Sequence, residues 1–203
     1  MKKVTKVAVF LLATALILAA CASPTTSPEG EEVDSGERAL NLSILAPLTT
    51  LNPLDSSNLQ DTMFFQQMND GLFHVNELTG EIEPRIAESW EISEDLKTIT
   101  FKIRSDAKFH NGDPVKASDV VYSFNFAMNS PRINGYYTSI ESVEAPDDTT
   151  FVMHLKSPNS GIFSTLSNHH YVLSEREMKE QGDKFGTTLH TASCGPYKLT
   201  RLD

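Results

Sequence analysis

Histidine and cysteine are the residues of this 203-residue chain best suited to bind a metal ion, and the chain has six and two of them. His169 and His170 form the only close pair of histidines in the sequence, but adjacent residues of a strand point to opposite faces. No two histidines have the helical spacing, with a glutamate between them, that a zinc protease site requires. His110 lies in an Asn-Gly turn and is interpreted as structural. The sequence therefore predicts no metal site and no cofactor.

Catalytic motifs are absent from the sequence. It contains no Gly-x-Ser-x-Gly elbow, no glycine-rich phosphate loop and no His-Glu-x-x-His. Asp147 and Asp148 resemble a carboxylate pair, but adjacent acids in a hairpin turn are usually turn formers. Tyr136 and Tyr137 are candidates for stacking on a ligand, and a half-buried strand edge explains them equally well. We therefore expect no enzymatic activity and no catalytic residues.

The charge balance restricts the partners. The chain has 27 acidic and 17 basic residues, which gives a net charge of −10. Removal of a leader that ends before Cys21 takes away Lys2, Lys3 and Lys6, and the remaining 14 basic and 27 acidic residues give −13. Nucleic-acid binding requires a basic face that displaces counterions, so we expect no nucleic-acid partner.

Residues 1–20 have the features of an export signal. Three lysines precede the apolar run 7–20, which is shorter than the ~18–20 residues that span a bilayer. The run ends in Leu18-Ala19-Ala20-Cys21, which resembles the lipobox of bacterial lipoproteins. The resemblance implies cleavage before Cys21 and attachment of a lipid anchor to Cys21. A plain secretory signal with a chance cysteine is the alternative interpretation.

Residues 21–39 are rich in Ser, Thr, Pro, Gly and acidic residues, and Val33 is their one large aliphatic residue. Such a segment buries too little apolar surface to become ordered, so we predict a flexible tether. Together with the signal, the tether places a folded region outside the cytoplasm. That region would be lipid-anchored to the membrane, on its periplasmic side or at the cell surface.

Residues 40–203 show mixed secondary-structure patterns. Strands are predicted where apolar and polar residues alternate, at 40–46, 98–104, 140–145 and 151–155, with a further strand starting at Gly195-Pro196-Tyr197. Turns are predicted at 51–54, 76–80, 94–97, 111–113 and 146–150. Helices are predicted at 61–72, 118–130, 160–168 and 174–181, the last opened by a Ser174–Glu177 capping box. Short strands interspersed with helices indicate the α+β class.

The predicted core includes one helix face and the single tryptophan. Met63, Phe64, Met68 and Leu72 recur at helical spacing, and we interpret them as core packing. Trp90 is interpreted as a core anchor rather than as a platform for a ligand.

Three stretches of the sequence, taken in order, carry a resemblance to a known family. Leu51-Asn52-Pro53 follows the first predicted strand, the long segment 84–124 runs through the 98–104 strand into the 118–130 helix, and Gly195-Pro196-Tyr197 comes near the end. This pattern resembles the family 5 extracellular solute-binding proteins, the peptide- and nickel-binding components of ABC importers. The family usually has a small or hydroxyl residue at the position of Cys194, whose thiol we interpret as a buried small group.

The resemblance implies a two-lobed fold of the periplasmic-binding-protein kind (type II). Residues 40–203 would be the N-terminal portion of that solute-binding domain, with an extra subdomain at about 72–189. Because family members are much longer, we expect this chain to be an N-terminal fragment that lacks the second lobe. One wall of a cleft encloses little of a ligand, so we expect this piece alone to bind solute weakly or not at all.

The resemblance also implies a function. The chain would be the substrate-binding component of an ABC importer, which captures peptides or related small solutes and delivers them to permease subunits. The resemblance also places a ligand-contacting loop at Ser56, Ser57, Asn58 and Leu59. The equally weighted alternative is that these residues form an ordinary surface loop and the N-cap of the following helix. A truncated lipoprotein that acts as an interaction or structural module is the alternative function.

Overall fold

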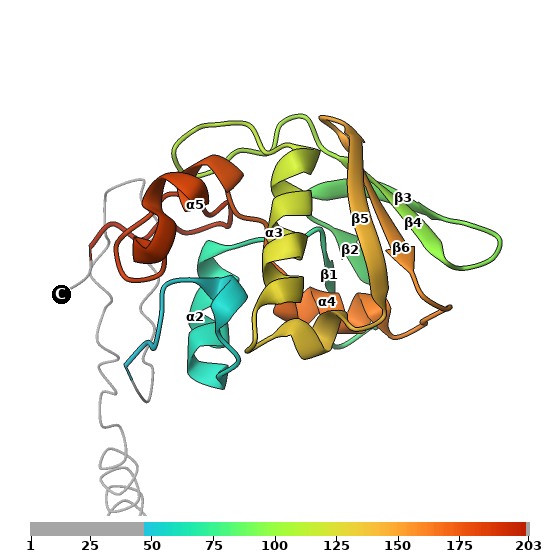
Figure 1. Ribbon diagram of the computed structural model, residues 1–203, viewed down its shortest axis with the longest axis horizontal. Helices are drawn as coiled ribbons and strands as arrows, with labels where there is room; N and C mark the ends of the chain where they lie inside the picture. The colour runs from blue at the N-terminus through green and yellow to red at the C-terminus, as the bar shows by residue number, and fades with distance from the viewer. Residues whose placement is uncertain (1–46, 202–203) are drawn as a thin grey trace, which may run out of the picture. The chain divides into compact units, whose positions relative to one another are not determined.

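The computed structural model describes residues 47–201 (Figure 1). The predicted signal peptide, Cys21, the tether 21–39 and the predicted strand 40–46 lie outside the described residues. The described part contains helices and runs of antiparallel strands, in agreement with the predicted α+β class. Within this part, no helix combines the length and the apolar character needed to cross a membrane.

A four-stranded antiparallel sheet forms the centre of the fold. Its strands are β3 (Ala87–Ile92), β4 (Thr98–Ile103), β5 (Ile140–Asp147) and β6 (Thr150–Leu155), in the spatial order β3-β4-β6-β5. Ile99, Phe101 and Ile103 of β4 are buried, whereas Lys102 is exposed, because successive side chains of a strand point to opposite faces. The predicted strand 98–104 and the predicted hairpin formed by 140–145 and 151–155 are therefore confirmed.

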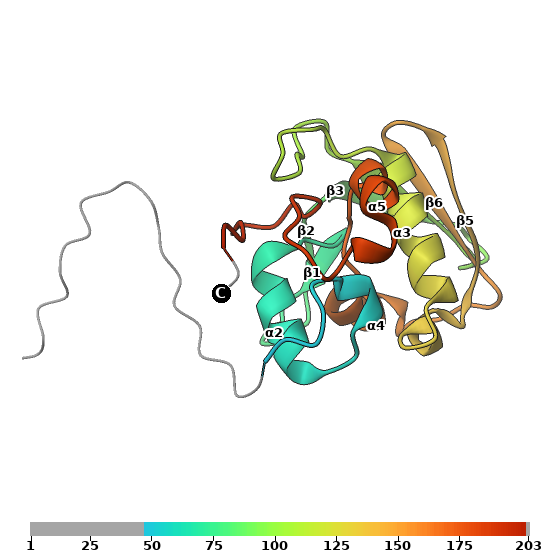
Figure 2. The same cartoon turned by 60° about the vertical axis from the view of Figure 1, so that its left-hand side comes forward.

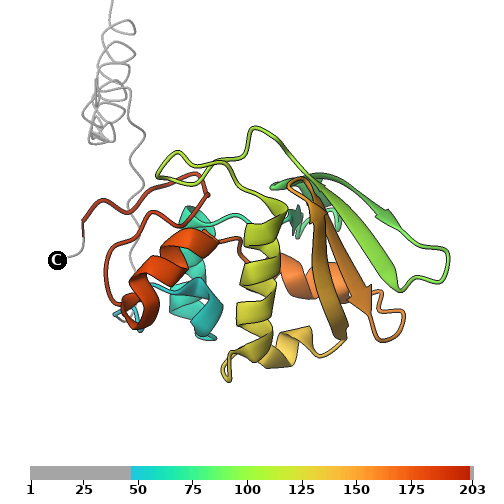
Figure 3. The ribbon, with the colours of Figure 1, turned by 45° about the horizontal axis from the view of Figure 1, so that its top comes forward.

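Two helices cover one face of this sheet (Figures 1 and 3). They are α3 (Ala117–Asn129) and α4 (Ile162–His169). Phe124 of α3 stacks on Phe151 of β6 at 5.0 Å between ring centroids, and Phe163 of α4 lies 6.3 Å from Phe101 of β4. The sheet is thus buried on the face that carries these rings, as is common for antiparallel sheets. Trp90 is half-buried and packs on Phe163, which supports its interpretation as a core anchor.

The first helix differs from the prediction. A short 3₁₀ helix, η1 (Pro53–Asp55), precedes α2 (Leu59–Met68), which begins two residues before the predicted start and ends four before the predicted end. The helix stops because Asn69 has an extended backbone and its Nδ2 donates to the Phe65 carbonyl. Phe65 and Met68 are buried as core residues, whereas Met63 is 52% exposed, so its assignment to the core is wrong.

Strand β3 of the central sheet and two further, shorter strands were not predicted. β1 (Phe73–Val75) and β2 (Ile82–Pro84) pair antiparallel across the predicted turn 76–80. β1 and β2 have three residues each, which is too short for the alternation of apolar and polar residues to be recognised. The Asn76 side chain stabilises the turn by accepting hydrogen bonds from the backbone of Leu78 and Thr79.

The last helix is followed by an irregular segment. Helix α5 (Glu175–Gln181) is capped by Ser174, whose hydroxyl accepts from the Glu177 N–H, as predicted. In a full capping box, the Glu177 carboxylate would also accept a hydrogen bond from the backbone N–H of Ser174, and this bond is not formed. The carboxylate accepts instead from the backbone and hydroxyl of Thr191. A 3₁₀ turn, η3 (Gly182–Lys184), separates α5 from the segment that leads to Gly195.

Among the described residues, no strand begins at Gly195, so this prediction is wrong. A strand needs a neighbouring strand to pair with, and this segment meets the end of a helix instead. The Gly195 N–H donates to the Met68 carbonyl at 2.9 Å, and the Tyr197 N–H donates to the Gln67 carbonyl at 3.1 Å. Figure 2 shows this C-terminal segment beside α2.

Candidate ligand-binding loop

The predicted loop, residues 56–59, connects η1 to α2. Asn52 holds the turn that leads into this loop, because the Asn52 Oδ1 accepts from the Leu54 N–H at 3.0 Å and caps η1. The Leu51 N–H donates to the Gly186 carbonyl at 2.7 Å, and this bond ties the start of the loop to a distant part of the chain. The loop therefore follows a rigid turn, as expected for the Leu-Asn-Pro sequence.

Asn58 is the N-cap of α2. Its Oδ1 accepts from the Asp61 N–H at 2.9 Å, and its extended backbone marks the start of the helix. This geometry is the N-cap alternative that the sequence left open for the loop. It uses the Asn58 side chain for the helix, so this side chain is not available to a ligand.

A buried carboxylate organises the loop. Asp61 is fully buried and accepts hydrogen bonds from the Ser56 hydroxyl at 2.6 Å and from the Asn58 Nδ2 at 3.0 Å. Thr49 donates to the same carboxylate through its backbone N–H and its hydroxyl. Sequence reasoning missed Asp61, although an N-cap asparagine followed by an acid three residues later is a recognisable capping signal.

The outer side of the loop is open. Ser57 is exposed and Leu59 is 70% exposed, with the exposed Met63 one turn further along α2. The first N–H groups of a helix have no partner within it, and those of Leu59 and Gln60 bond to no other group among residues 47–201. The loop thus presents two backbone donors beside an apolar surface, and its inner side is held by Asp61.

A comparison with protein families decides where this chain belongs. Residues 81–203 match the model of the bacterial extracellular solute-binding proteins, family 5 Middle. The chain belongs to family 5 of the bacterial extracellular solute-binding proteins. The family consists of solute-binding proteins rather than enzymes.

Curated proteins and solved structures agree with membership of family 5. The chain is 28% identical to the periplasmic oligopeptide-binding protein OppA of Haemophilus influenzae, over 92% of this chain and 38% of that protein. It is 31% identical to the dipeptide-binding protein DppE of Bacillus subtilis, over 82% of this chain and 34% of that protein. The structure of Listeria monocytogenes OppA bound to peptide superposes with a TM-score of 0.72 at 28% identity, over 82% of this chain and 37% of that one.

The match covers part of the family 5 fold. The chain spans about two fifths or less of the curated relatives named above. The matched structures are two-lobed binding proteins, and the described residues of this chain form a mixed helix and sheet portion of that fold. The predicted family and the predicted fold class are therefore confirmed.

Other candidate residues in this family 5 chain are explained by packing. Tyr136 stacks on His169 at 3.8 Å between centroids, and the Tyr137 hydroxyl donates to the His169 carbonyl at 2.9 Å. His170 is buried against Phe124. His169 and His170 thus pack in an aromatic cluster at the end of α4 and do not lie in a strand. Between residues 47 and 201, no group of three or more His, Cys, Asp or Glu residues is arranged to hold a metal ion.

The adjacent acids and the second cysteine have ordinary roles. Asp147 accepts from the backbone and hydroxyl of Thr149, which holds the pKa of its carboxyl at about 2, and Asp148 pairs with Lys116 at 2.8 Å. The Cys194 thiol lies 3.4 Å from the Val172 carbonyl, and burial raises its pKa to about 12. A thiol that stays protonated is a poor nucleophile, which agrees with its interpretation as a buried small group.

Proposed function

We propose that this chain is part of a binding protein that captures oligopeptides outside the cytoplasm and delivers them to an ABC permease. Membership of family 5 is the observation that carries the proposal, and the names of the matched relatives support peptides as the solute class. The absence of catalytic motifs and the net charge of −10 are consistent with a role that involves neither catalysis nor nucleic acid.

In this proposal, the loop 56–59 binds the main chain of the peptide. The open N–H groups of Leu59 and Gln60 would donate to peptide carbonyl oxygens, while Leu59 and Met63 would contact the peptide's apolar surface. Main-chain hydrogen bonds do not depend on the side chains of the peptide. Such a site would therefore accept peptides of varied sequence.

Residues 40–203 would supply one wall of the cleft, with the extra subdomain at about 72–189. Capture would follow from closure of two lobes over the peptide, driven by contacts that exist only in the closed state. Ligand sites typically bury ~70–90% of the ligand, which one wall does not achieve. We therefore expect the 203-residue chain to bind short peptides in the millimolar range; micromolar affinity would contradict the one-wall assignment.

Replacement of Leu59 tests the backbone donors. In Leu59→Pro the N–H at the first helical position is removed, yet α2 should be retained, because proline is favoured there and Asn58 already has an extended backbone. Leu59→Ala is the matched control, since it removes the same side chain and keeps the N–H. We expect trialanine to bind Leu59→Pro about tenfold more weakly than Leu59→Ala, as for the loss of one well-placed hydrogen bond.

The affinities are measured by titrating trialanine into the ¹⁵N-labelled chain and following amide chemical shifts. In the unsubstituted chain, the amides of residues 57–60 should move. Equal affinities for the two variants, or shifts confined to other regions, would show that the loop does not bind the peptide main chain.

We further propose that Cys21 carries a lipid that anchors the protein to the membrane. The lipobox-like Leu18-Ala19-Ala20-Cys21 supports this proposal. Two or more acyl chains give stable attachment, whereas one gives marginal binding. In Cys21→Ser the chain should not be acylated and should leave the membrane fraction for the soluble fraction.

Cys194→Ser is the matched control for this experiment, since Cys194 is the other cysteine of the chain and its thiol lies against the Val172 carbonyl. Metabolic labelling with a fatty acid and cell fractionation provide the measurement. Retention of the label or unchanged fractionation of Cys21→Ser would contradict the anchor.

A further inference from the structure

An apolar pocket of about 480 Å³ lies between the turn that joins β3 to β4 and the start of α4. Eight of its ten lining residues are apolar, and the other two are Asn159 and Ser160. Figures 1 and 3 show the β3–β4 turn on the side of the fold away from α2. The pocket is therefore separate from the loop 56–59, and its role does not depend on peptide binding.

The pocket has a buried floor and an exposed apolar rim. The floor consists of Ile99, Leu155 and Ile162, each of which is at most 3% exposed. Ile92 and Leu96 at the rim are 48% and 54% exposed. Exposed apolar side chains that lie together around a hollow mark binding sites more often than isolated ones do. The sheet and α4 hold the floor, so the pocket exists before any ligand binds.

Leu96 also has an unfavourable backbone conformation. Its φ is +58°, in a region that glycine adopts readily and that residues with a Cβ mostly avoid. Ser93 holds this turn, because its carbonyl accepts from the Leu96 N–H and its hydroxyl accepts from the Thr98 N–H, both at 2.9 Å. A bulky residue in this conformation costs stability, and such outliers cluster at functional sites. A ligand that covers the leucine side chain would offset this cost.

The wall restricts the chemistry of a ligand. Since no charged side chain is among the described residues that line the pocket, a charged group inside it would lose hydration without compensation. The half-buried Asn159 supplies one polar group. Its Oδ1 accepts from the Gly161 N–H at 3.0 Å, whereas its Nδ2 bonds to no group between residues 47 and 201. The Nδ2 is therefore available to donate to a neutral acceptor such as a hydroxyl oxygen.

The volume restricts the size of a ligand. It lies within the ~300–1,000 Å³ that is usual for small-molecule sites, and it is roughly three times the ~150 Å³ of an apolar cavity that binds benzene. One side chain of a protein partner would leave much of it empty. Phe163 is the single aromatic residue among the described residues that line the pocket. The mainly aliphatic wall suits a flexible aliphatic chain.

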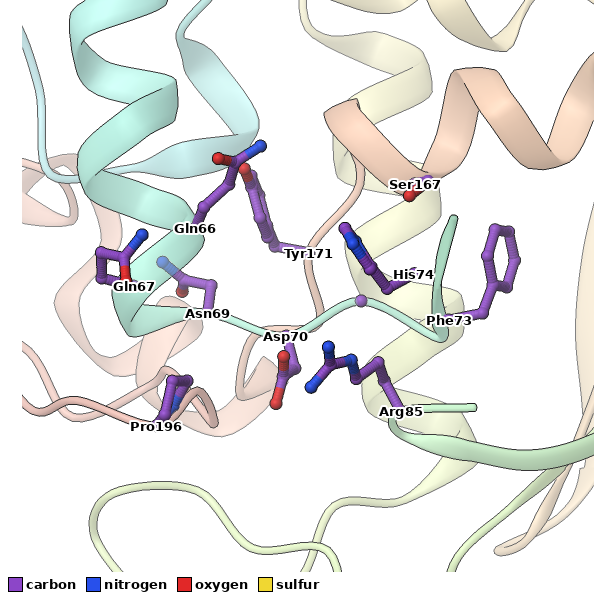
Figure 4. A pocket seen from close by; sticks show the side chains of 11 residues that line it. Gln66, Gln67, Asn69, Asp70, Phe73, His74, Arg85, Ser167, Tyr171 and Pro196 are labelled. Atoms are coloured by element: carbon purple, nitrogen blue, oxygen red, sulfur yellow. The ribbon is translucent and has the colours of Figure 1, made fainter. Parts of the chain in front are cut away.

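A second pocket, at the C-terminal end of α2, has a different character. Its volume is about 270 Å³, and Figure 4 shows the charged side chains of Asp70 and Arg85 among those that line it. An aliphatic chain in this second pocket would remove water from these charges without replacing it. The pocket beside Leu96 is therefore the favourable site for an aliphatic ligand.

We propose that the pocket beside Leu96 binds a free neutral amphiphile with an aliphatic chain of medium length. The chain would cover the floor and the exposed side chains of Ile92 and Leu96, and burial of this apolar surface would drive binding. The neutral head, such as a hydroxyl group, would accept a hydrogen bond from the Asn159 Nδ2.

Titration of the full chain with 1-octanol tests the proposal. Trp90, the single tryptophan, lies 5.8 Å from Phe163 between ring centroids, so its fluorescence should change and saturate. 1-Hexanol should bind about tenfold more weakly, because each buried methylene contributes roughly fourfold. Octanoate and octylammonium carry a charge, and each should bind at least tenfold more weakly than 1-octanol. No saturable change, or an affinity that does not depend on chain length or on charge, would overturn the proposal.

Three variants localise the binding. Ile92→Lys places a charge at the rim and should weaken 1-octanol binding at least tenfold. Leu96→Gly should weaken it several-fold without lowering the urea midpoint, because glycine tolerates the positive φ. Leu78→Gly is the matched control, since it removes the same side chain from a 98% exposed position outside the pocket, and it should leave the affinity unchanged. Unaltered affinity of Ile92→Lys would refute the site.

Other occupants of the pocket would give different results. A second copy of the chain would give dimers in analytical ultracentrifugation that Ile92→Lys disrupts. A bilayer lipid would give cosedimentation with phosphatidylcholine vesicles that Ile92→Lys lowers. We expect neither effect, and either one would overturn the assignment to a free amphiphile. Trialanine should leave 1-octanol binding unchanged, so failure of the peptide loop and failure of this pocket are distinguishable.

Discussion

Asp61→Ala is expected to lower the free energy of unfolding by about 3 kcal/mol, since it removes the acceptor of four hydrogen bonds, which contribute roughly 0.5–1.5 kcal/mol each. The fully buried carboxylate accepts from Thr49, Ser56 and Asn58, so its removal frees the loop 56–58 together with the start of α2. In our proposal the same variant also weakens peptide binding.

Urea unfolding followed by Trp90 fluorescence measures the effect of Asp61→Ala, because Trp90 packs in the aromatic core. The midpoint should fall at an unchanged slope. Asp183→Ala is the matched control, since Asp183 is exposed, and we expect a change within about 0.5 kcal/mol. A loss for Asp61→Ala no larger than for Asp183→Ala would mean that this carboxylate does not hold the loop.

Gly195→Ala is the second change with a large expected effect. An added Cβ would lie 2.4 Å from the Asn69 nitrogen and the Met68 carbonyl carbon. Both atoms belong to the backbone and do not yield as a flexible side chain does. The segment would have to move away and lose the bond from its N–H to the Met68 carbonyl. We expect a loss of about 3 kcal/mol, at the upper end of overpacking effects.

Gly135→Ala is the matched control for Gly195→Ala, because nothing lies within 4 Å of a Cβ at Gly135. It should be neutral or stabilise the protein by up to about 1 kcal/mol, through the smaller entropy of the unfolded chain. The two variants are compared in the same urea experiment. Equal midpoints would show that the chain crossing at Gly195 is looser than the structure indicates.

Much of the sheet could be predicted from the sequence, because alternation is a local property. The pattern of Ile99, Phe101 and Ile103 places three apolar side chains on one face of β4 wherever that strand lies. The Ser174 cap of α5 is local in the same way. Elements whose length is set by neighbours were predicted less well. Helix α2 ends at Met68 because the chain must then pass close to Gly195 and His170.

The candidate site was only partly visible in the sequence. Ser56 and Asn58 were singled out, but the loop depends on Asp61, which is buried by contacts made on folding. Whether the loop contacts a ligand stays a prediction.

The sequence by itself determined the family, the α+β class, the expectation of an export signal and the position of the candidate loop. These features depend on short segments whose residue types and spacing carry the information. Only the tertiary structure buried the Asp61 carboxylate and placed Gly195 against the end of α2. The physical reason is that burial and contacts of this kind come from segments that are distant in the sequence and meet only when the chain folds.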